Sequence, residues 1–317
     1  MTEFLQAKNL IEGSKNILLT THERTDGDDL GSVLSLAIYL RSAEKQVTLC
    51  ITGGVPERLQ YLPYSENVIE QLPEKNYDLL IVSGCSSLDR VRNHRIEQLN
   101  IPIINFDHHP DNKQFATVNV VDAKKSAVAE LVYDFFNYCQ WEIEKDVALC
   151  LLTGIITDTG MLMHSNTSSS TLAAAGELMK HGAHISEVAK NTFATHDTNK
   201  LKAWGKALEN SFFNAETKVI YSVITEKEIQ ELGNPELASF EGLVETLNKV
   251  PEARFAMFLK EDGARIKGSL RSDPHKGIDV QKIAQDLGGG GHKWAAGFSM
   301  VGKLVKTDAG RWKIAEN

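Results

Sequence analysis

Three segments of the sequence place aspartates directly after apolar runs, and two of these segments also contain histidines. Carboxylate and imidazole groups in combination suit Mn²⁺, Fe²⁺ or Mg²⁺ better than a structural zinc ion. The segments therefore predict a metal-dependent enzyme. Their candidate residues are Asp107, His108 and His109, then His22, Asp26 and Asp28, and finally Asp158.

The cluster nearest the N-terminus also fits a helix cap, because Asp26, Asp28 or Asp29 could accept hydrogen bonds from the first turn of the helix that follows. A cap needs one acid, whereas this segment has three. Gly27 permits a tight turn that could direct Asp26 and Asp28 to the same side. We expect metal binding here and keep capping as the alternative.

The neighbours His108 and His109 should point to different sides, so at most one of them shares a metal with the first cluster. The other could donate a proton or contact a phosphoryl oxygen. Asp107 could instead be a turn residue before Pro110, and Asp158 could equally be a cap or turn residue.

Short apolar runs that alternate with helical patterns must position these residues. The alternation predicts an α/β fold with a parallel sheet. Ligands bind at the carboxyl ends of the strands in such sheets, and His22, Gly84 and Asp107 all follow expected strands. The expected strands are residues 16–21, 47–52, 78–83 and 101–106.

The pattern changes after a polar, helix-prone stretch. We expect a catalytic domain over residues 1–190, a helical connector over 191–213 and a smaller α/β domain over 214–317. The elements expected in this second domain are strands at 219–224, 254–259 and 265–270 and a helix at 280–287.

Four consecutive glycines in the second domain need an explanation, since glycine has a large conformational entropy cost. Exposed N–H groups there could cradle a phosphate or carboxylate, and Arg271 beside Ser272 adds a guanidinium suited to bidentate phosphate binding. His292 adds another donor. A flexible turn is the alternative. The glycines are Gly288, Gly289, Gly290 and Gly291.

Composition restricts the partners and the class of protein. Hydrophobic content of 42% and charged content of 24% are ordinary for a globular protein. A net charge of −8 argues against coating long nucleic acid. The four cysteines are scattered, which disfavours disulfides and thiolate zinc sites. The sequence has no evident signal peptide or membrane span, so we expect a cytoplasmic protein.

Together the motifs resemble the DHH phosphoesterase family, in its two-domain DHH–DHHA1 branch. THERTDGDDLGS is similar to the family's first motif, FDHHP to the signature that names it, and TGIITDTG to the last motif of the catalytic domain. GSLRS followed by GGGGHKWAAG resembles the hallmark of the DHHA1 domain. Within the family, the chain is most similar to the stand-alone nanoRNase/pAp-phosphatase type, the bifunctional oligoribonucleases.

The resemblance implies a two-metal site, usually of Mn²⁺, that hydrolyses phosphate esters with an activated bridging water. His109 would position the phosphate or protonate the leaving oxygen, with Asp107 as support. By position, His22 and Asp26 would bind one metal, and Asp28, His108 and Asp158 the other. The other end of the substrate would be held by Arg271, Ser272, the four glycines and His292.

Two positions depart from the family pattern. The family's second motif ends its strand with an Asp that bridges both metals, where this chain has Gly84. Two divalent ions ~3.5–4 Å apart repel by on the order of 15–20 kcal/mol at an effective dielectric of about 20, a bare Coulomb term that a glycine does not offset. The second departure is Met161-Leu-Met163, where the family commonly has an Arg and an aromatic.

We therefore expect a metal-dependent phosphoesterase of short oligonucleotides, linear dinucleotides or nucleoside 3′,5′-bisphosphates (pAp). The alternative is a nucleotide-binding protein whose catalysis is lost or impaired because Gly84 occupies the bridging position. Gly84 would be either an introduced inactivating change or an adaptation to one tightly held metal in place of two. The expected partner is a small nucleotide, with no membrane and no long nucleic acid, and the resemblance allows a homodimer.

Overall fold

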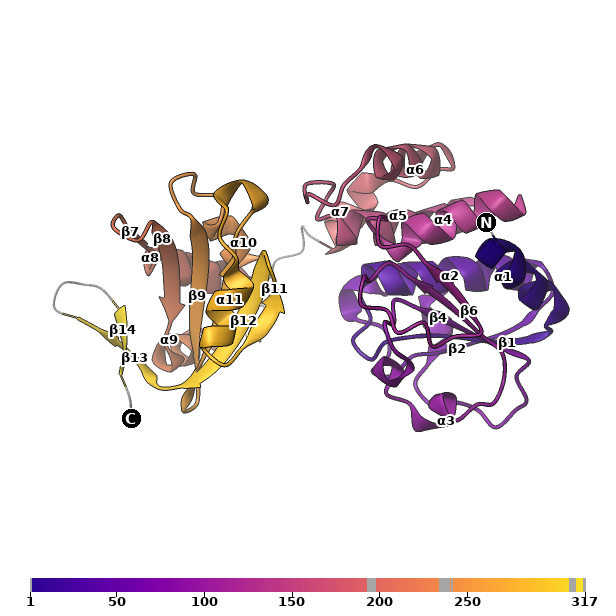
Figure 1. Cartoon of the computed structure of the whole chain (residues 1–317), viewed down its shortest axis with the longest axis horizontal. Helices are drawn as coiled ribbons and strands as arrows, with labels where there is room; N and C mark the ends of the chain where they lie inside the picture. Colours follow the sequence, from indigo (N-terminus) through magenta and orange to yellow (C-terminus); the bar gives the residue numbers. More distant parts are fainter. Residues whose placement is uncertain (1, 193–197, 234–239, 241, 308–311, 316–317) are drawn as a thin grey trace. The chain divides into compact units, whose positions relative to one another are not determined.

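The structure is a computed structural model that describes residues 2–192, 198–233, 240, 242–307 and 312–315. The chain forms two compact units, Met1–Thr195 and His196–Asn317 (Figure 1). Within the described ranges, none of the helices has the length and apolarity that crossing a bilayer requires.

A six-stranded parallel sheet is the centre of the first unit, in the order β3-β2-β1-β4-β5-β6, which confirms the expected α/β fold. Its order puts β4 between β1 and β5, so the segments that follow these three strands are neighbours at one edge of the sheet. The strands are β1 (Asn16–Thr21), β2 (Gln46–Cys50), β3 (Val68–Ile69), β4 (Leu79–Ser83), β5 (Ile103–Asp107) and β6 (Val118–Val121).

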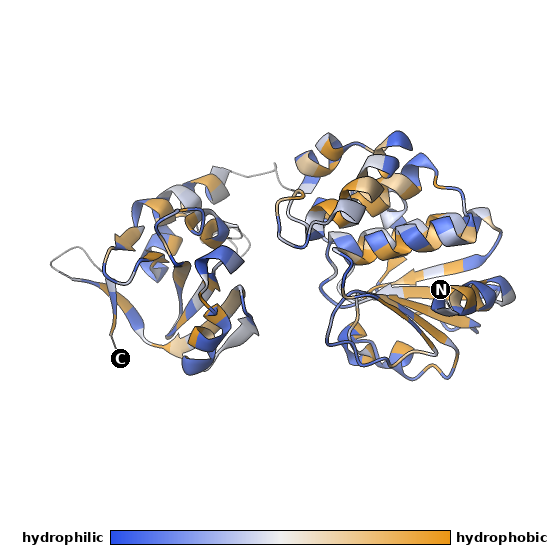
Figure 2. Cartoon of the chain, turned by 45° about the horizontal axis from the view of Figure 1, so that its top comes forward, coloured by the Kyte–Doolittle hydropathy of each residue, from blue (hydrophilic) through white to orange (hydrophobic). Residues whose placement is uncertain are grey.

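Side chains alternate between the two faces of the sheet along each strand. Both faces are buried, each by its own hydrophobic core. Ile17 and Leu19 belong to the core beneath the main helices, whereas Leu18 belongs to the core on the other face. Figure 2 shows the resulting apolar strands. The helices are α1 (Thr2–Gly13), α2 (Gly27–Ser42), α3 (His94–Glu97), α4 (Val128–Cys139), α5 (Lys145–Asp158), α6 (Ser169–Lys180) and α7 (Ile185–Thr192), with short 3₁₀ turns η1 (Glu57–Leu59), η2 (Ser65–Asn67) and η3 (Leu88–Val91).

Helices α2 and α5 pack unusually closely, and three glycines allow it. A Cβ at Gly31 would overlap the carbonyl oxygen of Cys150, one at Gly27 would overlap the side chain of Thr157, and one at Gly154 would lie 2.9 Å from Oδ1 of Asp28. Such contacts leave no room for any larger residue. The packing brings the first turn of α2 against the last turn of α5.

The second unit contains a mixed six-stranded sheet in the order β11-β12-β10-β9-β8-β7. Only β8 and β9 pair in parallel among its described strands. The strands are β7 (Phe212–Asn214), β8 (Val219–Ile224), β9 (Phe255–Asp262), β10 (Arg265–Arg271), β11 (Gly290–His292) and β12 (Ala295–Val301), with β13 (Lys303–Lys306) and β14 (Trp312–Ala315) paired separately. The helices are α8 (Thr198–Glu209), α9 (Glu226–Glu231), α10 (Leu243–Leu247) and α11 (Val280–Asp286), with the 3₁₀ turn η5 (Pro274–Lys276).

The stretch 191–213, expected as a connector, contains α8. This helix packs on β8 of the second unit: Ala203 and Ala207 lie in its core, and the hydroxyl of Ser222 donates to the carbonyl of Ala207 at 2.5 Å. Residues 193–197 of the stretch lie outside the described residues.

Candidate metal centre

Six side chains converge at the carboxyl edge of the parallel sheet in two groups of three. Within each group, candidate ligand atoms lie within 4.8 Å of one another. All five residues expected to bind metal belong to these groups, and Asp29 is the sixth. The first group is His22, Asp26 and Asp29, and the second is Asp28, His108 and Asp158.

The first turn of α2 distributes its acids between the two groups. Asp26 is the helix cap, since its Oδ1 accepts from the N–H groups of Asp28 at 3.0 Å and Asp29 at 3.1 Å. Residues three apart share a helical face, whereas consecutive residues do not. Asp26 and Asp29 therefore join His22, while Asp28 faces α4. Asp26 thus caps α2 and also belongs to a candidate ligand group.

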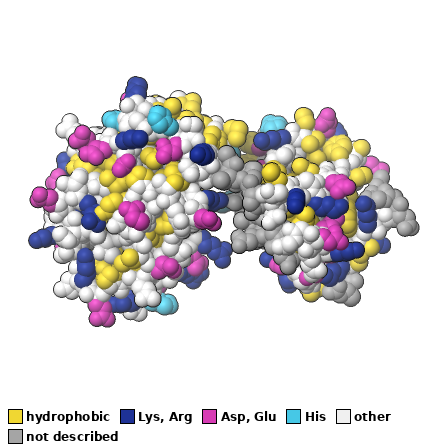
Figure 3. Space-filling view, turned by 180° about the vertical axis from the view of Figure 1, so that it is seen from behind, with side chains coloured by type: hydrophobic (Ala, Val, Ile, Leu, Met, Phe, Trp, Pro, Cys, Tyr) yellow, Lys and Arg dark blue, Asp and Glu magenta, His cyan; other side chains and the backbone are white. Residues whose placement is uncertain are grey.

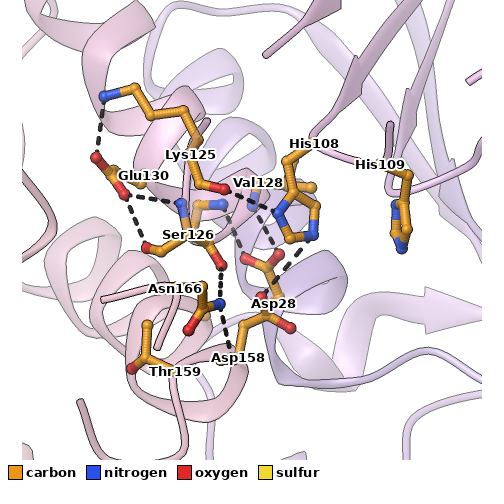
Figure 4. Close-up of polar contacts among 12 residues, drawn as sticks. Asp28, His108, His109, Lys125, Ser126, Val128, Glu130, Asp158, Thr159 and Asn166 are labelled. Atoms are coloured by element: carbon orange, nitrogen blue, oxygen red, sulfur yellow. Dashed lines mark hydrogen bonds and ion pairs between the residues drawn. The ribbon is translucent and has the colours of Figure 1, made fainter. Parts of the chain in front are cut away.

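Asp28 lies at the N-terminus of α4. Its Oδ2 accepts from the N–H of Val128 at 2.7 Å and its Oδ1 from that of Ala129 at 2.8 Å (Figure 4). A helix N-terminus stabilises negative charge. Each carboxylate oxygen retains a further lone pair. The hydrogen bonds therefore orient Asp28 and leave both of its oxygens able to bind a metal ion.

His108 is held in the tautomer that metal binding requires. Its Nδ1 lies 3.2 Å from the carbonyl oxygen of Lys125 (Figure 4). A carbonyl can only accept, so Nδ1 carries the proton and Nε2 keeps its lone pair. That Nε2 lies 3.8 Å from Oδ2 of Asp158. His108 thus presents its free nitrogen to the second group.

A buried glutamate that the sequence did not single out fixes this carbonyl. Glu130 is fully buried on α4 and accepts from the ammonium of Lys125 at 3.0 Å and from both the N–H and hydroxyl of Ser126. Hydroxyls of Ser170 and Thr171 also donate to it. Burial opposes ionisation, but these hydrogen bonds lower the pKa of Glu130 to about 2. The network immobilises the loop that orients His108.

Asp107 and His109 form a separate dyad beside the second group. The buried Asp107 accepts at Oδ1 from Nδ1 of His109 at 2.7 Å, and at Oδ2 from the amide of Asn112. Burial opposes ionisation of Asp107, yet the bonds from His109 and Asn112 lower its pKa. The hydrogen bond to Asp107 raises the pKa of His109 against the effect of burial. Asp107 thus favours a protonated His109.

The electrostatics of the two groups fit divalent cations. Burial raises the pKa of Asp26, and burial with the nearby Asp158 charge raises that of Asp28 well above its ordinary value. Burial also raises the pKa of Asp158 to about 6, against the attraction of His108. The groups contain four carboxylates, whose charge two divalent ions would balance. Clustered buried acids with two imidazoles are a donor set suited to Mn²⁺.

Gly84 follows β4, and the space that its side chain would fill is taken. A Cβ built on Gly84 would lie 1.6 Å from Oδ1 of Asp29 and 2.1 Å from its Cγ. The φ of Gly84 is +64°, in the left-handed region. Sequence reasoning treated Asp29 only as a cap. The available signal was a third acid, Asp29, directly after Asp28, in a chain with glycine at position 84 where the family pattern has its bridging acid.

The segment after Asp158 is a left-handed turn. Met161 and Leu162 both have φ of 63°, which is uncommon for residues with a Cβ. The hydroxyl of Thr159 accepts from the N–H of Leu162 at 3.1 Å and supports the turn. Met163 is 72% exposed. Backbone strain of this kind concentrates at ligand-binding sites.

In the second unit, packing accounts for most of the glycine run. Gly288 has a φ of +75° and ends α11, while any Cβ at Gly289 or Gly291 would overlap β12. A Cβ at Gly290 would meet nothing within 4 Å, so the structure gives no steric reason for that glycine. His292 is exposed on β11.

Arg271 and Ser272 differ in their availability for a ligand. The hydroxyl of Ser272 is 3.0 Å from the carbonyl of Arg254, and the residue is buried. The Nε of Arg271 donates to Glu245 at 2.8 Å. Arg271 also lines a cavity of about 270 Å³, whose lining includes Lys260, Lys267, Ser269, Phe240 and Phe258.

Comparison with known proteins agrees with this architecture. Residues 16–155 match the N-terminal domain of the DHH family, and residues 216–309 match the DHHA1 domain. The chain is 30% identical over 289 residues to the bifunctional oligoribonuclease and PAP phosphatase NrnA of Thermus thermophilus, covering 90% of this chain and 84% of that one. It is 27% identical over 306 residues to the protein of the same name from Bacillus subtilis, covering 94% and 93%.

The fold is also that of a solved structure, an exopolyphosphatase-related protein from Bacteroides fragilis. The TM-score is 0.85 at 23% identity, over 94% of this chain and 90% of the other. The chain therefore belongs to the DHH phosphoesterase family, in the branch that joins a DHH domain to a DHHA1 domain, and it is a phosphoric ester hydrolase.

Proposed function

We propose that this hydrolase uses Mn²⁺ to cleave short oligonucleotides, linear dinucleotides or nucleoside 3′,5′-bisphosphates. The observation that carries the proposal is the pair of three-residue ligand groups beside the Asp107–His109 dyad. The relatives named as oligoribonuclease and PAP phosphatase, matched over most of their length, support the substrate class.

The ligand groups divide the work of holding two ions. His22, Asp26 and Asp29 would hold one, and the group of His108 would hold the other. When bound, such ions supply Lewis-acid activation of water and neutralise charge on the phosphoryl oxygens.

His109 would deliver a proton to the leaving oxygen. Its Nδ1 is engaged by Asp107, so Nε2 is the ring nitrogen available to a substrate. Asp107 raises the pKa of His109, which keeps the imidazole protonated to higher pH. General acid catalysis of this kind contributes about 10²–10⁴-fold. The side chain of His109 is 35% exposed, so a substrate can reach it.

The DHHA1 unit would recognise a further phosphate or base of the substrate. The cavity lined by Arg271 also presents the cations Lys260 and Lys267 and the rings of Phe240 and Phe258. Cations suit phosphate, and aromatic rings suit stacking against a base. Its volume of about 270 Å³ fits a small group and not a polymer.

The surface also favours a small substrate. On the face in Figure 3, basic and acidic side chains are interspersed and form no continuous basic tract. A protein that binds long nucleic acid gains its affinity by neutralising many phosphates, and this chain has a net charge of −8.

The test is hydrolysis by the purified chain with Mn²⁺. The substrates are a 5′-phosphorylated diribonucleotide and adenosine 3′,5′-bisphosphate. Hydrolysis of the first is measured by chromatography of the mononucleotides, and hydrolysis of the second by phosphate release. The His108→Ala variant and a chelator are the controls, because the variant removes a ligand of the second ion and the chelator removes both ions. Turnover that both controls abolish supports the proposal.

The alternative of a nucleotide-binding protein without catalysis rested on the missing carboxylate at Gly84. The Asp29 carboxylate in the space next to Gly84 supports the hydrolase over this alternative. Binding of both nucleotides without turnover, in a chain that has taken up Mn²⁺, would establish the alternative and overturn the proposal.

A further inference from the structure

We propose that Asp29 supplies the carboxylate that bridges the two metal positions, in place of the side chain that Gly84 lacks. The inference rests on the metal-dependent function proposed above and deepens it. It assigns a role to an acid in the first turn of α2 and makes positions 29 and 84 a coupled pair.

Strand order explains why a side chain at position 84 would lie between the two ligand groups. His22 follows β1, and His108 follows β5. Strand β4 lies between them, and Gly84 is its next residue, with its N–H donating to the carbonyl of Phe106 on β5 at 2.9 Å. A side chain at the end of β4 therefore has one group on each side.

The carboxylate of Asp29 occupies that place. All three atoms of the group lie within 2.2 Å of where a Cβ on Gly84 would be. Real Cβ atoms essentially never approach another heavy atom within 3.0 Å, so the two side chains exclude each other. The observed position of the Asp29 carboxylate therefore requires a glycine at position 84.

Neighbouring groups hold Asp29 in this position. Its Oδ2 lies 2.8 Å from Nε2 of His22, and its Oδ1 accepts a longer bond from the hydroxyl of Ser83 at 3.4 Å. Asp29 is only 3% exposed. This buried carboxylate contacts the imidazole with which it would share an ion.

In principle, the bridging carboxylate can also be moved from position 29 to position 84. At φ +64° most residues are strained, but Asp is among the few with a Cβ that adopt the left-handed region readily. If Asp29 were replaced by alanine, an aspartate at position 84 would have enough space and a backbone conformation that aspartate can adopt.

The experiment is Mn²⁺ titration of the full chain, followed by the electron paramagnetic resonance of free Mn²⁺ and by calorimetry. We expect two ions per chain in the unaltered protein. Asp29→Ala and the isosteric Asp29→Asn should lose one ion or bind it at least about 100-fold more weakly. The double variant Asp29→Ala/Gly84→Asp should recover two. Asp111→Ala, which removes an exposed acid near His109, should not change binding.

The outcomes separate this inference from the proposed function. Two ions at unaltered affinity in both Asp29 variants would overturn the bridging role and leave the function intact. If the Asp29 variants lose one ion and the double variant does not recover it, although circular dichroism shows that the double variant is folded, an aspartate at position 84 does not replace Asp29. Absence of Mn²⁺ binding by the unaltered chain would overturn the proposed function itself.

Discussion

Nδ1 of His109 lies 2.7 Å from Oδ1 of Asp107, and the same Oδ1 accepts the backbone N–H of His108 at 2.9 Å. One buried carboxylate therefore orients both histidines of the signature. It engages Nδ1 of His109, the proton donor proposed above, and it also holds the backbone of His108, which belongs to the second ligand group. The two neighbouring histidines thus have different partners and different chemistry.

Replacing Asp107 with Asn should shift the pH dependence of kcat. A general acid must be protonated, so activity falls as pH rises through its pKa. Asp107 raises the pKa of His109, so the alkaline loss of activity should begin at a lower pH in the variant than in the unaltered chain. Profiles of kcat against pH at saturating Mn²⁺ measure the pH at which activity is lost. An unchanged alkaline limb would show that His109 is not the acid, and His109→Gln, with a loss of about 10²–10⁴-fold, is the reference.

Replacing Glu130 with Gln should weaken binding of the second ion, although Glu130 is not itself one of the proposed ligands. Glu130 holds the loop whose Lys125 carbonyl orients His108. Loss of such support typically lowers metal affinity about 10–100-fold. Asp134→Asn is the matched control, since Asp134 contacts the same ammonium at 2.6 Å but is 38% exposed. Equal Mn²⁺ affinities for the two variants by calorimetry would contradict this role.

Glu130 should also make the protein acid-sensitive. Its pKa is lowered from 4.5 to about 2, so its contribution is fully present above 4.5 and is lost as pH falls toward 2. The shift corresponds to about 3 kcal/mol for this buried group. Urea unfolding should give a difference between unaltered chain and Glu130→Gln that is smaller at pH 3 than at pH 7. A difference independent of pH would refute the assignment.

Mn²⁺ affinity should rise as pH increases through about 6. Asp158 has its pKa raised to about 6, and a metal ion must displace that proton. Without metal, the raised pKa means that this group's contribution to stability is present at low pH and declines as pH rises from 3.8 to about 6. Calorimetry at pH 5 and 7 tests the affinity. Asp158→Asn should bind weakly at both values, with the pH dependence much reduced.

The sequence predicted much of the fold because local patterns determine it. Buried parallel strands are short apolar runs, and those at 16–21, 78–83 and 101–106 correspond to β1, β4 and β5. The order of these strands in the sheet was not available from the sequence. That order makes neighbours of the segments after β1, β4 and β5.

Asp29 and Glu130 illustrate what a single sequence does not reveal. Asp29 gains its role from Gly84, which is 55 residues away and is brought near only by the packing of α2 on the sheet. Glu130 resembles any acid near a helix N-terminus until its burial and its partners are known. In both cases tertiary contacts decide the function of a residue whose type is common.

The most direct test of the account is anomalous diffraction at the manganese edge from crystals of the unaltered chain grown with Mn²⁺. Two peaks are predicted, one among His22, Asp26 and Asp29 and the other among Asp28, His108 and Asp158, with the Asp29 carboxylate between them. A single peak, or two peaks with the Asp29 side chain contacting neither, would contradict it.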